Sequence, residues 1–271
     1  MIGIFLLILA VSPVCAAHPQ QLKDRSITSD DFNKSRKNSK RRTSPLRRYG
    51  LASAPLAKPL DINHPSTLKA GVTLWNVQRI GAGPSVKETA TSVEADHQFH
   101  DGDLLRLSIE SPVDGYLYVI DRDWFTDGSS GETKLIFPQR GDDNRLKAGK
   151  LIDIPAEHDA PFMASPQPNQ AGEMLTIIIT LAPLSLPLSN APLPLSGTQL
   201  AVWERKWGGM TERFEMNGGA GATRTIEEQQ AASSRGIRQL TRADPAPQTI
   251  YLLTPRSRGG LLFNLLLSCV R

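Results

Sequence analysis

From residue 70 onward, short apolar runs alternate with turn-forming residues, and this spacing constrains the fold more than any other feature of the sequence. Residues 104–110 show the pattern: Leu105, Leu107 and Ile109 fall on one face of an extended chain, since side chains alternate along a strand. The turn signal 111–115 follows directly. With 20 Pro, 21 Gly and no long heptad pattern, the chain is predicted to be a turn-rich β protein.

The strand pattern predicts an all-β fold, an antiparallel β-sandwich that is immunoglobulin-like in general architecture. The candidate strands are residues 72–77, 104–110, 115–121, 134–137, 151–154, 174–181, 200–204, 249–253 and 261–267. Residues 104–110 and 115–121 are expected to form a hairpin, and the last two strands a second pair. Residues 174–181 are fully apolar at Ile177–Ile179 and suit a central strand. One short helix is expected at 226–232, capped by Thr225.

The first 17 residues resemble a secretory signal peptide. An apolar run from Ile2 to Val11 is too short to span a bilayer comfortably and is followed by small residues up to Ala17. The chain is therefore expected to be exported, to the periplasm or the extracellular space, with no transmembrane helix after cleavage. Cys15 leaves a lipoprotein signal open, although Val14 before it fits such a signal poorly. Cys269 would then be the one remaining thiol, and it is predicted to be buried in a terminal strand.

Residues 18–69 are predicted to be a disordered, basic, Pro-containing linker, and residues 70–271 the folded domain. Ten basic and three acidic residues between Lys23 and Arg48 give this arm a charge of +7 in a chain of net +4, so the high pI belongs to the arm. The arm either contacts an anionic surface or is only a solvated linker. No nucleic acid is expected as a partner, because aromatic residues are almost absent from the arm.

Several motifs between residues 72 and 181 occur in a specific order. They include Asp114-Gly115-Tyr116-Leu117-Tyr118-Val119, Leu135-Ile136-Phe137-Pro138, and Asp143-Asn144-Arg145-Leu146-Lys147-Ala148-Gly149 followed by Ile154-Pro155. Residues 72–181 thereby resemble the bacterial domain-of-unknown-function family numbered 4384. The resemblance implies a β-sandwich-like domain of exported or envelope-associated proteins, with no catalytic residues to transfer. Strands between residues 199 and 268 would complete the domain beyond this core.

The best metal candidate is the stretch 121–132, which has acids at several positions of a calcium loop. Its possible ligands are Asp121, Asp123, Asp127 and Glu132. However, Phe125 and Thr126 stand where such a loop needs a ligand and a sharp-turning Gly. A polar hairpin loop is the preferred interpretation, and no metal or cofactor is predicted.

The sequence contains no nucleophile elbow and no convincing catalytic Cys/His pair. We therefore expect a non-enzymatic exported module that binds a protein or an envelope component. One alternative is a hydrolase of envelope polymer that uses carboxylates around Asp121–Glu132 or the group His97–Asp103. Another is a sandwich that binds calcium or carbohydrate.

Overall fold

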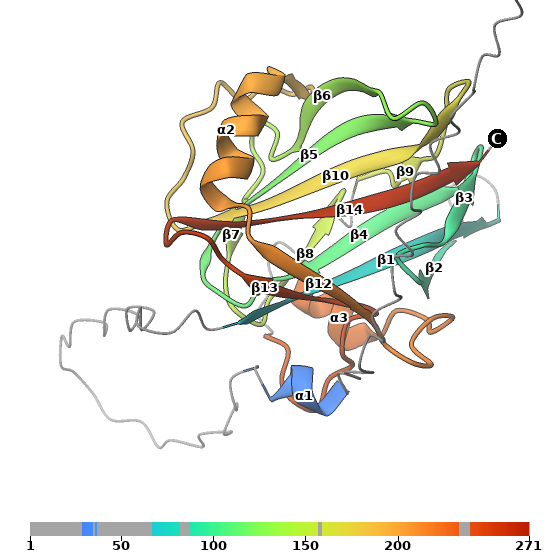
Figure 1. Ribbon diagram of the computed structural model, residues 1–271. Helices are drawn as coiled ribbons and strands as arrows, with labels where there is room; N and C mark the ends of the chain where they lie inside the picture. The colour runs from blue at the N-terminus through green and yellow to red at the C-terminus, as the bar shows by residue number, and fades with distance from the viewer. Residues whose placement is uncertain are drawn as a thin grey trace, which may run out of the picture.

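The structure of the protein is a computed structural model, which describes residues 29–34, 36, 67–81, 87–156, 159–232 and 239–270. The predicted signal peptide and most of the basic arm lie outside these residues. Two β-sheets pack face to face, which confirms the predicted β-sandwich (Figure 1). In the described parts of the chain, no helix is long and apolar enough to cross a membrane.

Sheet A has the strand order β12-β13-β1-β4-β8, with β2 paired to β1 and β9 paired to β4. All of its pairs are antiparallel. The strands are β1 (Leu68–Ile80), β2 (Lys87–Val93), β4 (Leu104–Glu110), β8 (Leu151–Ile154), β9 (Phe162–Met163), β12 (Met210–Glu215) and β13 (Thr249–Thr254).

Sheet B has the strand order β11-β6-β5-β10-β14-β3, with β7 paired to β5. Its pairs are antiparallel except for β14 and β3, which run parallel. The strands are β3 (Gln98–His100), β5 (Gly115–Phe125), β6 (Ser130–Phe137), β7 (Arg145–Leu146), β10 (Gln170–Thr180), β11 (Leu193–Pro194) and β14 (Gly260–Val270). The apolar strand β10 lies between β5 and β14, as its sequence predicts for a central strand.

A single large apolar core fills the space between the sheets. Leu105, Leu107 and Ile109 of β4 and Leu117 and Val119 of β5 are all buried in it, which confirms the inward face predicted from alternation. Burying each such side chain stabilises the fold by about 1.5–3 kcal/mol before chain entropy is counted. The packing of apolar side chains from the two sheets against each other is therefore the main source of stabilisation of the fold.

The two predicted strand pairs are wrong in the same way. Strand β4 pairs with β1, β8 and β9 in sheet A, whereas β5 pairs with β10, β6 and β7 in sheet B. Residues 111–114 are thus a crossover between the sheets and not a hairpin turn. Strands β13 and β14 are likewise split between sheets A and B. In both cases two successive strands bury their apolar faces against each other across the core, and alternation alone does not distinguish this arrangement from side-by-side pairing.

The short helix predicted after Thr225 is confirmed as α3 (Ile226–Ala232). The Thr225 hydroxyl accepts a hydrogen bond from the Glu228 amide at 3.2 Å, and the Glu228 carboxylate accepts one from the Thr225 amide at 2.9 Å. This reciprocal arrangement is a capping box, which satisfies donors that the first helical turn leaves free.

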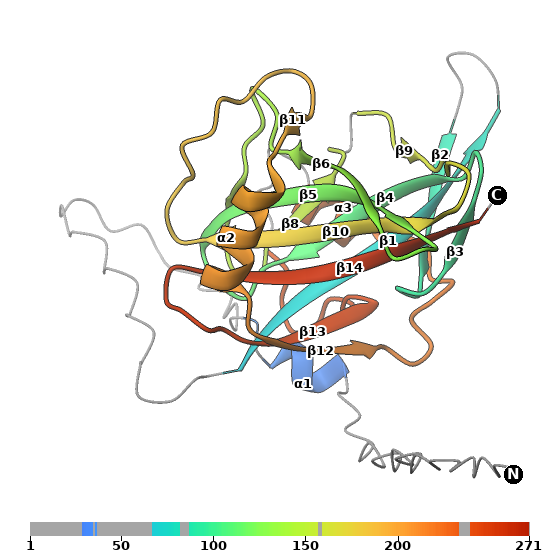
Figure 2. The same ribbon diagram turned by 45° about the horizontal axis from the view of Figure 1, so that its top comes forward.

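The predicted strand at 200–204 is wrong, because these residues lie within helix α2 (Gly197–Trp207). Ser196 caps this helix by accepting a hydrogen bond from the Gln199 amide at 3.1 Å. Leu200, Trp203 and Trp207 share one face and pack onto the outer surface of sheet B (Figure 2). Their spacing of three and four residues is helical, but the short run of Leu, Val and Trp also has high β-propensity.

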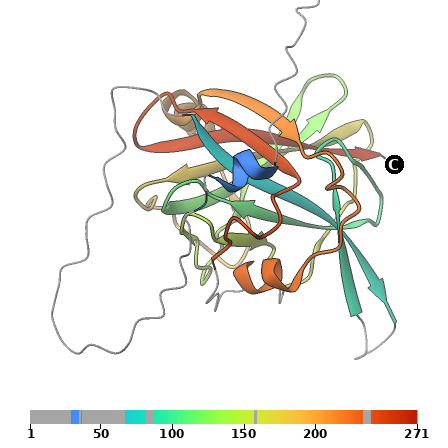
Figure 3. The same cartoon turned by 90° about the horizontal axis from the view of Figure 1, so that it is seen from below.

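Part of the predicted disordered arm is packed on the outside of sheet A. Helix α1 (Ser29–Asn33) lies over β1 and β13 (Figure 3), and Phe32 is 1% exposed. The Arg36 guanidinium is buried and donates to both oxygens of Glu110, at 2.8 and 2.7 Å. The structure therefore corrects the predicted disorder for residues 29–34 and Arg36. This segment docks on the sheet, because Asn33 and Arg36 contact residues more than 70 positions away.

Candidate functional site

The stretch 121–132 lies in the β5–β6 hairpin, as the polar-hairpin interpretation predicts. Asp127 lies in the exposed turn, where its carboxylate accepts the Ser129 amide at 2.8 Å, and the hydrogen bonds from Ser129 lower its pKa. Glu132 is exposed on β6 and pairs with Lys134 at 2.9 Å. Within the described residues, no group of three or more His, Cys, Asp or Glu side chains is arranged to hold a metal ion.

Asp121 and Asp123 lie on β5 and share its inward face, and β10 brings Glu173 directly opposite Asp123. These three carboxyls are close enough to influence one another's charge. Burial, reinforced by Asp123, raises the pKa of Asp121 to about 6. Burial and repulsion from Asp121 and Asp123 raise the pKa of Glu173 to about 7.

Glu173 was not among the residues predicted for a site. The alternation of side chains could have indicated its position, because Glu173 points to the same face of the strand as the core residues Leu175, Ile177 and Ile179. Cys269 of β14 is also near this group and is 4% exposed, as predicted for a structural cysteine. Burial, followed by the charges of Glu173 and Asp121, raises the pKa of its thiol to about 11, so the thiol stays protonated at neutral pH.

The histidines of the alternative site are turned apart. His97 packs edge-on against Phe99, with ring centroids 4.8 Å apart. The His100 ring is exposed and lies 3.7 Å from the Asp103 carboxylate, which also accepts the His100 amide at 2.7 Å. These contacts organise the turn that precedes β4.

A buried polar chain occupies the outer face of sheet A. The Trp75 indole donates to the Ser108 hydroxyl at 2.7 Å, and Ser108 donates to the Asp153 carboxylate at 2.6 Å. Arg224 pairs with the same carboxylate and lies over the Trp75 ring. Each of these polar groups has a partner within the network. The network therefore holds the segment before α3 against the sheet.

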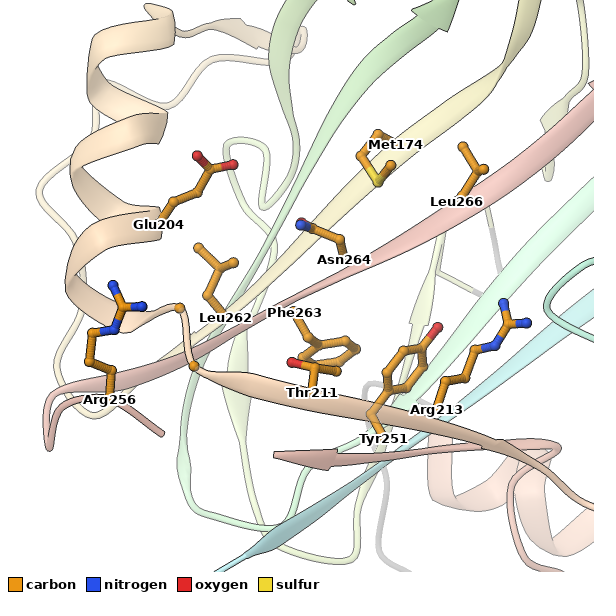
Figure 4. Close-up of a pocket in the computed structure, with 12 residues that line it drawn as sticks. Met174, Glu204, Thr211, Arg213, Tyr251, Arg256, Leu262, Phe263, Asn264 and Leu266 are labelled. Atoms are coloured by element: carbon orange, nitrogen blue, oxygen red, sulfur yellow. The ribbon is translucent and has the colours of Figure 1, made fainter. Parts of the chain in front are cut away.

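A hollow of about 670 Å³ opens on one flank of the sandwich (Figure 4). We call it the flank groove. It lies where β12, the outermost strand of sheet A, faces β14 of sheet B, and the C-terminal end of α2 closes one end. Its lining residues are Met174, Glu204, Gly208, Gly209, Thr211, Arg213, Tyr251, Arg256, Leu262, Phe263, Asn264 and Leu266.

The flank groove wraps around the edge of β14. Leu262 and Asn264 are on the outer face of sheet B, because Leu262 packs with the α2 cluster and Asn264 has the same parity. Phe263 is on the inner face and stacks on Tyr251 of β13, with centroids 4.7 Å apart. Arg213 pairs with Tyr251 in the register of β12 and β13, so it also points to the inner side. The hollow therefore reaches both faces of one strand.

Comparison of the chain with protein-family models, with curated proteins and with solved structures finds no match. The fold itself defines a two-sheet β-sandwich with a grooved flank and a partly docked N-terminal arm. The resemblance to the family numbered 4384 stays a prediction.

Proposed function

We propose that the protein is an exported, non-catalytic β-sandwich module that binds another protein or an envelope component, with its basic arm contacting an anionic surface. Its main support is the flank groove, a hollow of about 670 Å³ that is lined by apolar and polar side chains in similar measure. Protein-binding surfaces have this mixed composition, in which apolar area supplies affinity and polar groups fix orientation. The arm adds a second attachment, because its charge of +7 attracts anionic surfaces.

Affinity capture from envelope extract tests the proposal. The full chain is compared with a variant in which Lys40, Arg41, Arg42, Arg47 and Arg48 are changed to Gln, which removes charge from the arm but keeps the docked residues 29–34 and Arg36. Components that the variant still captures, saturably and after high-salt washing, are partners of the sandwich. Components that it loses are partners of the arm. Absence of any saturable component in both samples contradicts the proposal.

A second candidate function, hydrolysis of envelope polymer, has one specific observation in its favour. The pKa values of about 6 for Asp121 and about 7 for Glu173 let these carboxyls exchange protons near neutral pH, as acid/base catalysis requires. The polymer is incubated with the protein, and released soluble fragments are measured. Turnover that falls at least about 100-fold in Glu173→Gln supports hydrolysis. The matched control is Glu132→Gln, since Glu132 is exposed on the neighbouring strand and paired with Lys134.

A further inference from the structure

The edge of β14 is only partly covered by the chain itself. A parallel bridge joins Leu262 to Gly208, and β3 pairs in parallel with residues 268–270. Between these two points, no strand or bridge of the described residues pairs with Phe263–Leu267 on the side away from β10. This stretch is roughly 17 Å long at about 3.4 Å per residue. Alternate backbone N–H and C=O groups along it point outward from the sheet.

The uncovered edge lies in the flank groove. A strand added beside β14 would place one set of alternate side chains over the outer face of sheet B and the other set over the inner side. The outer set meets the apolar side chains of Leu262, Leu266 and Met174, with the polar Asn264 between the two leucines. The inner set meets Arg213 and Tyr251 (Figure 4). The groove thus has a different chemistry on each side of the missing strand.

The charge around the groove favours an acidic occupant. Two arginines, Arg213 and Arg256, line the groove, and Glu204 is the one acid among the lining residues. The Arg213 Nε lies 3.7 Å from one carboxylate oxygen of Glu215, and the other oxygen of Glu215 accepts the Thr249 hydroxyl at 3.0 Å. Because a guanidinium has five N–H donors, Arg213 keeps donors for a ligand.

Tyr251 supplies a further polar group. It is 2% exposed, and its hydroxyl has no hydrogen-bond partner among the described residues. Figure 4 shows that this hydroxyl points toward β14, next to the Arg213 side chain. A buried hydroxyl without a partner is unfavourable, so a polar group of an occupant that settles there gains a hydrogen bond.

We propose that the flank groove binds an extended segment of a partner protein, which adds as a strand to the β14 edge at Phe263–Leu267 and alternates apolar with acidic side chains. This inference rests on the proposed binding function and names its site and the chemistry of its partner. Backbone hydrogen bonds to β14 provide affinity, and the alternation provides specificity, as in other cases of strand addition.

Two labelled peptides of about seven residues, the length of a typical strand, test the proposal against the full chain by fluorescence anisotropy. One peptide alternates valine with aspartate, and the other alternates valine with lysine. The acidic peptide is expected to bind at least about ten-fold more tightly at low salt, since each exposed charge contact contributes up to about five-fold. Equal binding of the two peptides, or binding of neither, overturns the proposal.

Substitutions at matched positions identify the site. Arg213→Glu and Arg256→Glu are each expected to weaken the acidic peptide about five-fold. Arg258→Glu is the control, because Arg258 is an exposed arginine in the same β13–β14 connection but does not line the groove. Loss of binding in all three variants to the same extent contradicts recognition by the groove.

N-methylation tests strand addition itself. Methyl groups on one set of alternate peptide nitrogens remove the hydrogen bonds to β14, whereas methyl groups on the other set point away from it. We expect a loss of at least about ten-fold in one case and under about two-fold in the other. Equal effects overturn strand addition. A second copy of the chain is the rival occupant, and a dimer in sedimentation that the peptide dissociates would assign the groove to self-association.

A competition experiment separates this inference from the proposed function. If the sandwich captures an envelope component that Arg213→Glu also captures and that the acidic peptide does not displace, the binding function stands and the groove assignment fails. If the full chain captures nothing, the proposed function fails.

Discussion

Replacing Arg36 with alanine is expected to destabilise the fold strongly. The Arg36 side chain is buried and donates to Glu110 at 2.8 and 2.7 Å. It also donates to the carbonyls of Thr241, Asp244 and Pro245, at 3.0, 3.0 and 2.9 Å. Arg36→Ala therefore leaves a carboxylate that is 3% exposed without its cation, and each of the three carbonyls loses one donor.

The magnitude follows from the burial of Glu110. Removing one partner of a buried ion pair costs about 3–5 kcal/mol, because the other charge stays behind unpaired. A hollow of about 260 Å³ borders Phe32, Arg36 and Glu110, so water can reach the carboxylate once the guanidinium is gone. We therefore expect the lower end of the range, about 3 kcal/mol of unfolding free energy.

Urea unfolding of the full chain measures this loss, and thermal unfolding should show a decrease of about 6–12 °C in Tm for a domain of this size. Lys34→Ala is the control, since its contact with Asp31 is on the surface and should contribute less than about 0.5 kcal/mol. Arg36→Met combined with Glu110→Leu should recover much of the stability, because no charge is left buried. A loss below about 1 kcal/mol for Arg36→Ala would refute the reasoning.

Three further predictions follow from local geometry. Glu173→Gln should stabilise the fold by about 2 kcal/mol at pH 8, allowing for its partial exposure, and leave it unchanged at pH 4. The raised pKa of about 7 means that the folded state loses stability as the pH rises from 4.5 through 7, and urea unfolding at both pH values checks this. Ser196→Ala should cost about 1 kcal/mol by removing the α2 cap, measured by urea unfolding, and an unchanged midpoint would contradict it. Gly172→Ala should lower the Tm, because a Cβ at this position would clash with the Leu267 carbonyl oxygen of β14 and push the paired strands apart. A Tm equal to that of the parent would show that the strands separate without cost.

The sequence was sufficient for eight of the nine predicted strands and for the inward face of the core, because alternation reflects burial, but it did not predict β2 or β12. Leu105, Leu107 and Ile109 show this, as does the central strand around Ile178. It was not sufficient for strand pairing. The turn at 111–114 has the chemistry of a hairpin, yet the two strands face each other across the core, and that choice depends on partners such as β1 and β10 that are distant in sequence.

Long-range contacts also explain what was missed at the candidate sites. Arg36 belongs to a strongly basic segment, and its burial depends on Glu110 and on carbonyls near residue 244. The flank groove is formed by β12, β13, β14 and α2, which meet only in the folded chain. Helix α2 was the exception, since Ser196 and the spacing of Trp203 and Trp207 are local signals that a helical interpretation could have used.

The division of successive strands between the sheets has a consequence for how the chain tolerates cleavage. Because the chain crosses from sheet A to sheet B at residues 111–114 and again between β13 and β14, neither sheet is made from one continuous segment. A protease cut in the surface segment between β10 and β11 would give two fragments, each contributing strands to both sheets. Each fragment would leave apolar faces uncovered without the other, so the nicked protein should stay assembled and separate only in denaturant.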